Sequence, residues 1–189
     1  MITVSTSKSY HHGDLRAALL DAGLKALETR DIAELSLRQL ARETGVSPTA
    51  VYRHFPDKNA LMQALAEAGI AEMARWQRDA ALAAEPDQAF AATGRAYVRW
   101  ALANPALFKL VFGHCAVGRE VFGDNEASEM LRGYAQTFAQ SADEVQRFMF
   151  QAWAVAHGLA MLMLDGQLPA DEALIDRVID AKTLFRAAA

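Results

Sequence analysis

Side chains that could recognise DNA gather between Ser36 and Lys58. Hydroxyl, guanidinium, ammonium, phenol and imidazole groups are the ones that bind phosphate oxygens or base edges. The candidate DNA-contact residues are Ser36, Arg38, Ser47, Thr49, Tyr52, Arg53, His54 and Lys58. We expect Ser47, Thr49 and Arg53 to reach base edges or phosphates, and the others to contact the sugar–phosphate backbone.

The pair His114-Cys115 offers a different chemistry, that of a thiol. Cys115 is the only cysteine, which excludes a disulfide within the chain and a metal cluster built on cysteine pairs. A thiol-dependent enzyme or redox sensor stays an alternative, although such a cysteine needs exposure and a lowered pKa. No orienting carboxylate or glycine-rich phosphate loop stands at a recognisable spacing. We therefore expect no enzyme, no catalytic residue, no metal and no cofactor.

The segment LRQLARETGVSPTAVYRHFPDK, residues 37–58, has the spacing of a helix-turn-helix. Ala41 supplies the small residue where two helices cross, and Gly45 tolerates the positive φ of a tight turn. Val46 and Val51 would fill the space between the helices. Helical pairs of this kind also occur in proteins that bind no DNA. Spacing alone thus leaves open that Tyr52, His54 and Phe55 are packing residues.

Helical periodicity covers nearly the whole chain, and no alternating apolar pattern predicts a strand. In the first half, caps and prolines predict four helices. These run from about Asp14, as N-cap, to Thr29; from a Ser36/Gln39 capping box to Gly45; from Ser47, with Pro48 at the first position, to Pro56; and from Asp57 to about Ala84.

The second half predicts longer helices. They comprise one carrying Phe90, Tyr97 and Ala101 and ending at Asn104-Pro105; a short piece over 106–112; one carrying Leu131, Tyr134 and Phe138; one over 143–164; and an amphipathic one over 171–185. Residues 113–125 form a loop and 165–169 a turn. Because the stretch 143–164 is apolar almost all round, we expect it to be buried on several sides.

Charge and hydropathy bound the compartment and the partners. The chain of 189 residues carries a net charge of −4, yet residues 1–60 hold eight Lys and Arg against seven Asp and Glu. A local positive face, and not a positive total, is what DNA binding requires. The longest uncharged run, Phe148 to Leu164, is shorter than the roughly 20 residues of a membrane span. No apolar leader opens the sequence. We expect a cytoplasmic protein with no membrane partner.

The stretch GVSPTAVYRHFPDKNAL, residues 45–61, resembles the recognition helix and following cap of the TetR family of bacterial regulators. The preceding SLRQLARET fits the second helix of that family, whereas Asn59 departs from its frequent Glu. The resemblance implies an all-α homodimer of about nine helices: a three-helix DNA-binding head over residues 1–60, and a larger antiparallel helical domain over 61–189 for effector binding and dimerisation. It also implies DNA contacts from the candidate residues above, Arg53 excepted.

Two weaker resemblances point to one subset of the family. The opening YHHGDLR, residues 10–16, is similar to the start of that subset, and Trp153, His157 and Gly158 match its Trp-x-x-x-His-Gly pattern. Lys8, His11 and His12 then form either an arm that touches DNA or an unstructured tail.

An effector pocket is expected between Phe90 and Met163, because aromatic walls with a few polar groups suit small molecules. The predicted ligand contacts are Trp100, Phe108, Phe112, Trp153, His157 and Met161, with His114 and Phe122 as further candidates. The alternative is that these residues are core, with His157 as a hydrogen-bonded core histidine and Gly158 allowing a close helix approach.

The last two predicted helices are apolar enough to pair with those of a second copy in a four-helix bundle. Two heads about 34 Å apart would then meet a pseudo-palindromic double-stranded operator. The sequence thus predicts a repressor that an unknown small-molecule effector releases from DNA.

Overall fold

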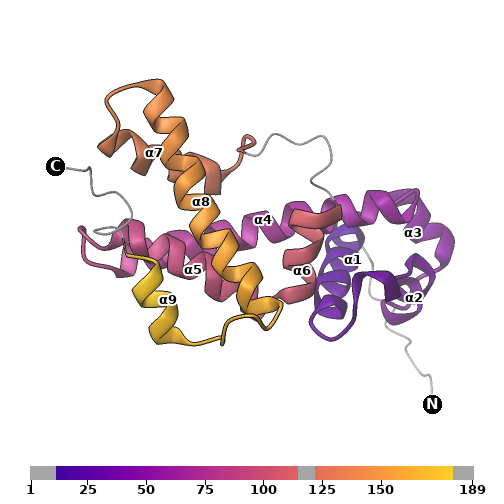
Figure 1. Cartoon of the computed structure of the whole chain (residues 1–189). Helices are drawn as coiled ribbons and strands as arrows, with labels where there is room; N and C mark the ends of the chain where they lie inside the picture. The colour runs from indigo at the N-terminus through magenta and orange to yellow at the C-terminus, as the bar shows by residue number, and fades with distance from the viewer. Residues whose placement is uncertain (1–11, 115–121, 181–189) are drawn as a thin grey trace, which may run out of the picture. The chain divides into compact units, whose positions relative to one another are not determined.

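The computed structural model describes residues 12–114 and 122–180, and these residues contain nine α-helices and no strand (Figure 1). The all-α fold class expected from periodicity is confirmed. The described residues divide into two compact units between Leu65 and Ala66, inside helix α4. We call them the head and the body.

The head contains α1 (His12–Leu27), a 3-10 turn η1 (Ile32–Glu34), α2 (Leu37–Glu43), α3 (Pro48–His54) and the first residues of α4 (Lys58–Ala83). Its three short helices pack on one another around a small apolar core. Leu19, Leu40, Val51 and Phe55 are fully buried there. Burial of each such side chain contributes roughly 1.5–3 kcal/mol to the free energy of folding, so a few residues hold α3 in place on the other helices.

The capping residues were predicted with mixed success. Ser47 caps α3 by accepting a hydrogen bond from the Ala50 amide at 3.3 Å, and Pro48 occupies the first turn. Asp57 likewise accepts from the Ala60 amide at 2.8 Å. The predicted capping box is wrong, because Ser36 makes no side-chain cap bond and Gln39 donates to Glu43 at 3.1 Å. Asp14 lies inside α1, which begins at His12, and does not cap it.

The body continues with α5 (Ala89–Ala103), α6 (Pro105–Lys109), the π-helical turn η2 (Leu110–His114), α7 (Glu126–Phe138), α8 (Ala142–Leu164) and α9 (Glu172–Val178). Helix α8 packs against α5 along one side and α7 along another. Trp100, Phe108 and Leu110 are fully buried in the centre. The body core is therefore built from α5, α6 and the inner face of α8.

Helix α8 is less buried than its composition predicts. Phe150 is 41% exposed and Leu162 is 39% exposed. Among residues 12–114 and 122–180, α8 alone is long and apolar enough to cross a membrane by length and composition, a test that core helices of soluble proteins also pass. Helix α8 is thus buried on the two sides that face α5 and α7, and it is exposed on the remainder of its surface in the single chain.

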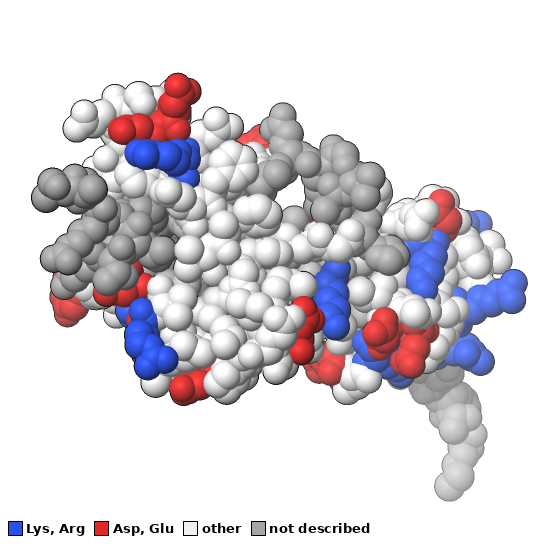
Figure 2. All heavy atoms as spheres, viewed as in Figure 1, with Lys and Arg blue, Asp and Glu red and all other residues white. Residues whose placement is uncertain are grey.

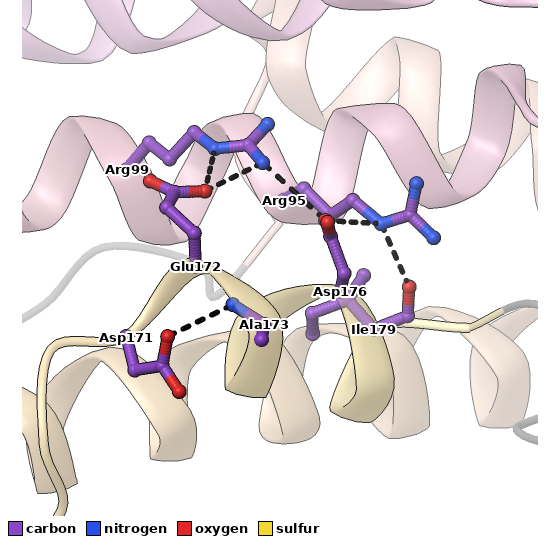
Figure 3. A network of polar contacts seen from close by, with 7 residues as sticks. All are labelled: Arg95, Arg99, Asp171, Glu172, Ala173, Asp176 and Ile179. Carbon is purple, nitrogen blue, oxygen red and sulfur yellow. Dashed lines mark hydrogen bonds and ion pairs between the residues drawn. The ribbon is translucent and has the colours of Figure 1, made fainter.

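Helix α9 is held on α5 by two arginines (Figure 3). Arg99 Nη2 lies 2.7 Å from Glu172 Oε2 and 3.3 Å from Asp176 Oδ1. Arg95 Nε lies 3.3 Å from Asp176 Oδ1 and donates to the Ile179 carbonyl at 3.2 Å. The helix ends at Val178, earlier than predicted, and Phe185 lies outside the described residues. Its apolar face, including Ile175, is already buried within the chain.

Candidate DNA-contact surface and effector cavity

A glycine turn orients helix α3 in the head. Gly45 has φ +71°, the left-handed conformation predicted for it. The next amide, that of Val46, donates to the Ala41 carbonyl at 2.9 Å and closes the turn. Ala41 is 1% exposed and Val51 is fully buried, so α2 and α3 cross closely on their inner faces. Ala41, Gly45 and Val51 thus carry the roles that their spacing predicted, whereas Val46, predicted to fill the space between the helices, is only half-buried.

The outer face of α3 holds the candidate DNA contacts. Ser47, Thr49 and Arg53 are exposed, and Tyr52 is 42% exposed although it is a large aromatic residue. Phe55 instead turns inward, where the Arg16 guanidinium lies 5.4 Å from its ring centre. Of the residues that could have been packing residues, only Phe55 is fully buried, and His54 is half-buried.

Ser36, Arg38 and Lys58 flank that face. Lys58 Nζ donates to the Ala33 carbonyl at 3.0 Å, which ties the start of α4 to η1 and leaves two ammonium protons for another acceptor. Arg38 is exposed in the first turn of α2, and Ser36 is half-buried just before it. The Ser36 hydroxyl makes no cap bond, and its O–H group can donate to an incoming phosphate.

Basic side chains are prominent on the head surface in Figure 2, at the end where Figure 1 shows α2 and α3, with acidic ones among them. One acidic residue there has its charge compensated. Glu43 lies 2.8 Å from Arg30 and also accepts from Gln39, and these hydrogen bonds lower the pKa of its carboxyl group. The repulsion that Glu43 would otherwise exert on a phosphate is thereby reduced.

The body contains a cavity of about 650 Å³ that is partly open to solvent, and its volume is within the size range of small-molecule sites. Four of the predicted contacts, Phe112, Phe122, Trp153 and His157, line it. Phe112 lies in the π-helical turn η2, and the sequence predicted its place in the pocket but not this turn. Such turns recur at functional sites in helical proteins.

Three predicted ligand contacts do not line this cavity. Trp100 and Phe108 are completely buried, because they form the aromatic core between α5 and α6, with ring centres 6.3 Å apart. Met161 lies one turn beyond His157 on α8, past the end of the cavity lining. Cys115 lies outside the described residues. Residues 12–114 and 122–180 contain no cluster of His, Cys, Asp and Glu suited to a metal ion.

Tyr97 contacts Trp153 and His157, two of the residues of α8 that line the cavity. Its hydroxyl lies 2.8 Å from His157 Nδ1, and it also accepts a hydrogen bond from Trp153. Burial raises the pKa of the Tyr97 hydroxyl, and the hydrogen bond from Trp153 lowers it by a smaller amount. Because an indole N–H only donates, we infer that the Tyr97 proton points to His157.

This arrangement fixes the state of the imidazole. Burial lowers the pKa of His157, which favours the neutral ring at neutral pH. With Nδ1 accepting from Tyr97, the proton of the neutral ring resides on Nε2. His157 is therefore a hydrogen-bonded histidine and a cavity residue at once, so the two readings of the sequence do not exclude each other.

Gln77 is a cavity residue that sequence reasoning missed. Its Nε2 donates to the Thr93 carbonyl at 3.4 Å, whereas its Oε1 is buried without a hydrogen-bond partner. An unsatisfied buried amide oxygen costs about 1–3 kcal/mol. The only signal in the sequence was a polar residue on α4, which does not distinguish an inward position from a solvated one.

Two family descriptions match the chain. Residues 19–65 match "Bacterial regulatory proteins, tetR family", and residues 90–182 match "Tetracyclin repressor-like, C-terminal domain". The first match contains the whole helix-turn-helix, and the second contains α5 to α9.

Curated relatives are regulators of the same kind. An HTH-type transcriptional regulator of Mycobacterium tuberculosis is 30% identical over 121 residues, which is 62% of this chain and 52% of that protein. An uncharacterized HTH-type transcriptional regulator of Haemophilus influenzae is 44% identical over 57 residues, 29% of this chain and 28% of that protein. The chain thus spans about half, or less, of the length of these relatives.

Solved structures share the fold over nearly the full length. A protein of unknown function from Rhodococcus sp. RHA1 is 32% identical with a TM-score of 0.73, covering 92% of this chain and 93% of that one. A TetR-family regulator from Streptomyces coelicolor is 18% identical with a TM-score of 0.65, covering 88% and 78%.

The narrower assignment to the Trp-x-x-x-His-Gly subset stays a prediction. Assignment to the family as a whole does not depend on that subset, because one family match falls on the head and the other on the body. With an exposed recognition helix in the first and an aromatic cavity in the second, this chain belongs to the TetR family of helix-turn-helix transcriptional regulators.

Proposed function

We propose that the protein is a homodimeric repressor that binds a pseudo-palindromic operator and leaves it when a small molecule occupies the cavity of the body. The observation that carries the proposal is the exposure of four polar or basic residues at and within α3, namely Ser47, Thr49, Tyr52 and Arg53. Helix α3 follows a tight turn in which Gly45 has a positive φ. The head supplies the DNA reader, and the body supplies a site whose occupancy can shift its conformation.

The roles on DNA follow from position. Thr49 lies in the first turn of α3, which in helix-turn-helix proteins approaches base edges in the major groove. Tyr52, in the second half of α3, and Lys58, at the start of α4, are both exposed and suited to phosphates. Ser36 and Arg38 sit at the N-terminus of α2, where free amides and the helix dipole favour an anion.

The uncovered face of α8 supports the homodimer. Phe150, Ala154, Gly158 and Leu162 follow one another at helical spacing, so apolar and small side chains form one stripe. A Cβ added at Gly158 would meet nothing within 4 Å in the single chain, which corrects the expectation of a close approach there by its own helices. We assign that approach to α8 of a second copy.

Helix α9 plays a smaller part in this dimer than the sequence suggested. Its apolar residues Ile175 and Ile179 are buried within the chain, and its charged residues bind Arg95 and Arg99. The exposed apolar surface of the hairpin formed by α7 and α8 includes Phe138, which is 50% exposed. We therefore propose that α8, next to α7, contributes most of the interface.

DNA binding is tested by fluorescence anisotropy of the purified full chain with duplexes from the region upstream of its own gene. We expect specific binding that weakens steeply as salt rises, because each neutralised phosphate releases counterions. A chain that binds neither these duplexes nor random DNA at low salt would contradict the proposed reader. Binding to all duplexes equally would contradict the operator but not the DNA-binding head.

The dimer is tested by sedimentation of Gly158→Leu beside Gly133→Leu. Both glycines lie in helices and have nothing within 4 Å of an added Cβ, so neither substitution clashes in the single chain. We expect Gly158→Leu to raise the dimer dissociation constant at least tenfold and Gly133→Leu to leave it within about twofold. A dimer unaffected by Gly158→Leu would place the interface elsewhere.

A further inference from the structure

Resting on the proposed function, we infer that the effector is a largely apolar compound that carries an acceptor oxygen, such as that of a carbonyl group, and that the Nε2–H group of His157 donates a hydrogen bond to it. The aromatic rings of the cavity would surround the apolar part. The position of the imidazole, its tautomer and the accessibility of Nε2 support this assignment.

The imidazole of His157 is fixed in the wall of the cavity. Phe108 and Trp153 lie against it with ring centres 5.4 Å and 5.0 Å away and interplanar angles of 29° and 31°. Phe112 meets it at a steeper angle, with ring centres 5.0 Å apart, and the Tyr97 hydroxyl lies 2.8 Å from its Nδ1. Because these neighbours come from α5, α6, η2 and α8, the ring has one defined orientation.

Tyr97 decides which nitrogen of the imidazole carries the proton. The Tyr97 side chain is 4% exposed, so its hydroxyl proton needs an acceptor inside the protein. His157 Nδ1 is that acceptor, while the hydroxyl oxygen itself accepts from Trp153. A nitrogen that accepts carries no proton, so Nε2 carries it and is a donor. A protonated ring would also donate from Nε2, so this donor does not depend on the charge of the ring.

The Nε2 atom of His157 remains available to a ligand. In the described part of the chain, the buried side-chain polar atoms without a partner are Gln77 Oε1 and Trp100 Nε1. His157 Nε2 is not one of them, and no hydrogen bond to it is found within residues 12–114 and 122–180. It is therefore accessible. Because His157 is half-buried and lines the cavity, we assign this accessible edge to the cavity.

Other polar side chains of the lining already have partners inside the protein. The Thr93 hydroxyl donates to the Phe90 carbonyl at 2.7 Å. The Asn125 amide group donates to the Gly123 carbonyl at 3.2 Å. A ligand would have to break these bonds to use the same donors, whereas the N–H group of His157 is ready to donate.

The described lining therefore complements an apolar compound with an acceptor. Phe90, Phe112, Phe122 and Trp153 contribute apolar surface, which provides most of the affinity in sites of this kind, and a few polar groups fix the orientation of the ligand. A carbonyl oxygen accepts a hydrogen bond and has no proton of its own that needs a partner. A hydrocarbon of the same shape would fill the cavity but leave the His157 donor unused.

The test is isothermal titration calorimetry of the full chain, without DNA, with two probes of the same shape. One is the ketone benzylacetone, and the other is the alkene in which a methylidene group replaces its carbonyl oxygen. We expect His157→Asn to weaken ketone binding about fivefold and alkene binding by less than about twofold, because only the ketone loses a hydrogen bond.

Two further variants separate the hydrogen bond from packing. His157→Gln can place an amide N–H near the position of Nε2, so it should keep ketone affinity within about twofold of wild type. Gln167→Asn, in an exposed turn outside the cavity, is the control and should change the affinity of neither probe.

Nitrogen NMR of the full chain labelled at histidine gives a readout that is independent of affinity. The His157→Asn variant identifies the His157 signals by their loss. We expect a proton on Nε2 and none on Nδ1 of His157. Benzylacetone should move the Nε2–H proton signal downfield, and the alkene should move it much less.

The assignment is overturned if His157→Asn weakens both probes equally, if the imidazole proton is found on Nδ1, or if neither probe binds. Equal weakening would mean that His157 only maintains the shape of the wall. Anisotropy with operator DNA is a separate measurement. Benzylacetone that binds through His157 without altering DNA affinity would refute ligand-induced release, while the assigned contact would stand.

Discussion

Replacing Tyr97 by Phe removes one oxygen atom and keeps the ring, so it tests the hydrogen bonds of the cavity wall without creating a void. The lost groups are the donor to His157 Nδ1 at 2.8 Å and the acceptor of the Trp153 bond. An intramolecular hydrogen bond contributes about 0.5–1.5 kcal/mol net, and a buried partner left unsatisfied costs about 1–3 kcal/mol.

The structure decides between these magnitudes. Tyr97 is only 4% exposed, yet His157 is half-buried beside a cavity of about 650 Å³ that is large enough to admit water. Water can therefore satisfy the histidine after the hydroxyl is removed. We expect Tyr97→Phe to lower the free energy of unfolding by about 1 kcal/mol, toward the lower end of the range.

The assay is urea unfolding followed by circular dichroism at a fixed protein concentration, because a dimer would make stability concentration-dependent. With a slope of about 2 kcal/mol per molar urea, the midpoint should fall by about 0.5 M. Tyr134→Phe, a half-buried tyrosine on α7, is the control and should change the midpoint far less. Equal midpoints for wild type and Tyr97→Phe would refute a stabilising role for this bond.

Three further predictions concern other parts of the chain. Gly45→Val should destabilise the head by about 1–2 kcal/mol in urea unfolding. Backbone strain alone would cause this loss, since nothing lies within 4 Å of the added Cβ. Gly45→Asn should destabilise the head less, and an equal loss of stability in the two variants would contradict backbone strain as the cause. In anisotropy titrations, Lys58→Ala should weaken binding to all duplexes and lower the salt slope by about one, whereas Thr49→Ala should reduce the preference for operator over random DNA; the reverse pattern would mean that α3 is docked differently. Burial lowers the pKa of His157 in the folded protein, so on acidification the unfolded chain binds this proton at a higher pH than the folded one. The free energy of unfolding should therefore fall as pH drops below about 6.5. A His157→Asn variant should lose less stability over that pH range, and an identical pH dependence of stability in variant and wild type would exclude His157 as the cause.

The helix-turn-helix could be predicted from sequence because its requirements are local. A positive φ at Gly45, a cap at Ser47 with Pro48 behind it, and a small residue at Ala41 all act within one or two helical turns. The capping box at Ser36 failed for a related reason. Gln39 donates instead to Glu43, one turn further along α2. Arg30, which lies outside the helix-turn-helix segment, also binds the Glu43 carboxylate and so holds it in position.

The cavity shows the limit of that reasoning. Trp100 and Phe112 are both aromatic residues of the same region, and nothing in their types separates core from cavity wall. Phe112, in the π-helical turn η2, lines the cavity, while Trp100 is fully buried in the core of the body. Gln77 was missed because one polar residue on a helix has no signature of an inward position.

The sequence by itself determined the all-α class, the turn, the recognition helix and the family, because short-range backbone preferences and helical periodicity are written in neighbouring residues. Only the tertiary structure decided which aromatics bound the cavity, how Tyr97 fixes His157, and that α9 is held on α5 by Arg95 and Arg99. The bonds from Tyr97 to His157 and from Arg95 to Ile179 join residues 60 and 84 positions apart in the chain, and such partners are selected by packing and burial rather than by spacing.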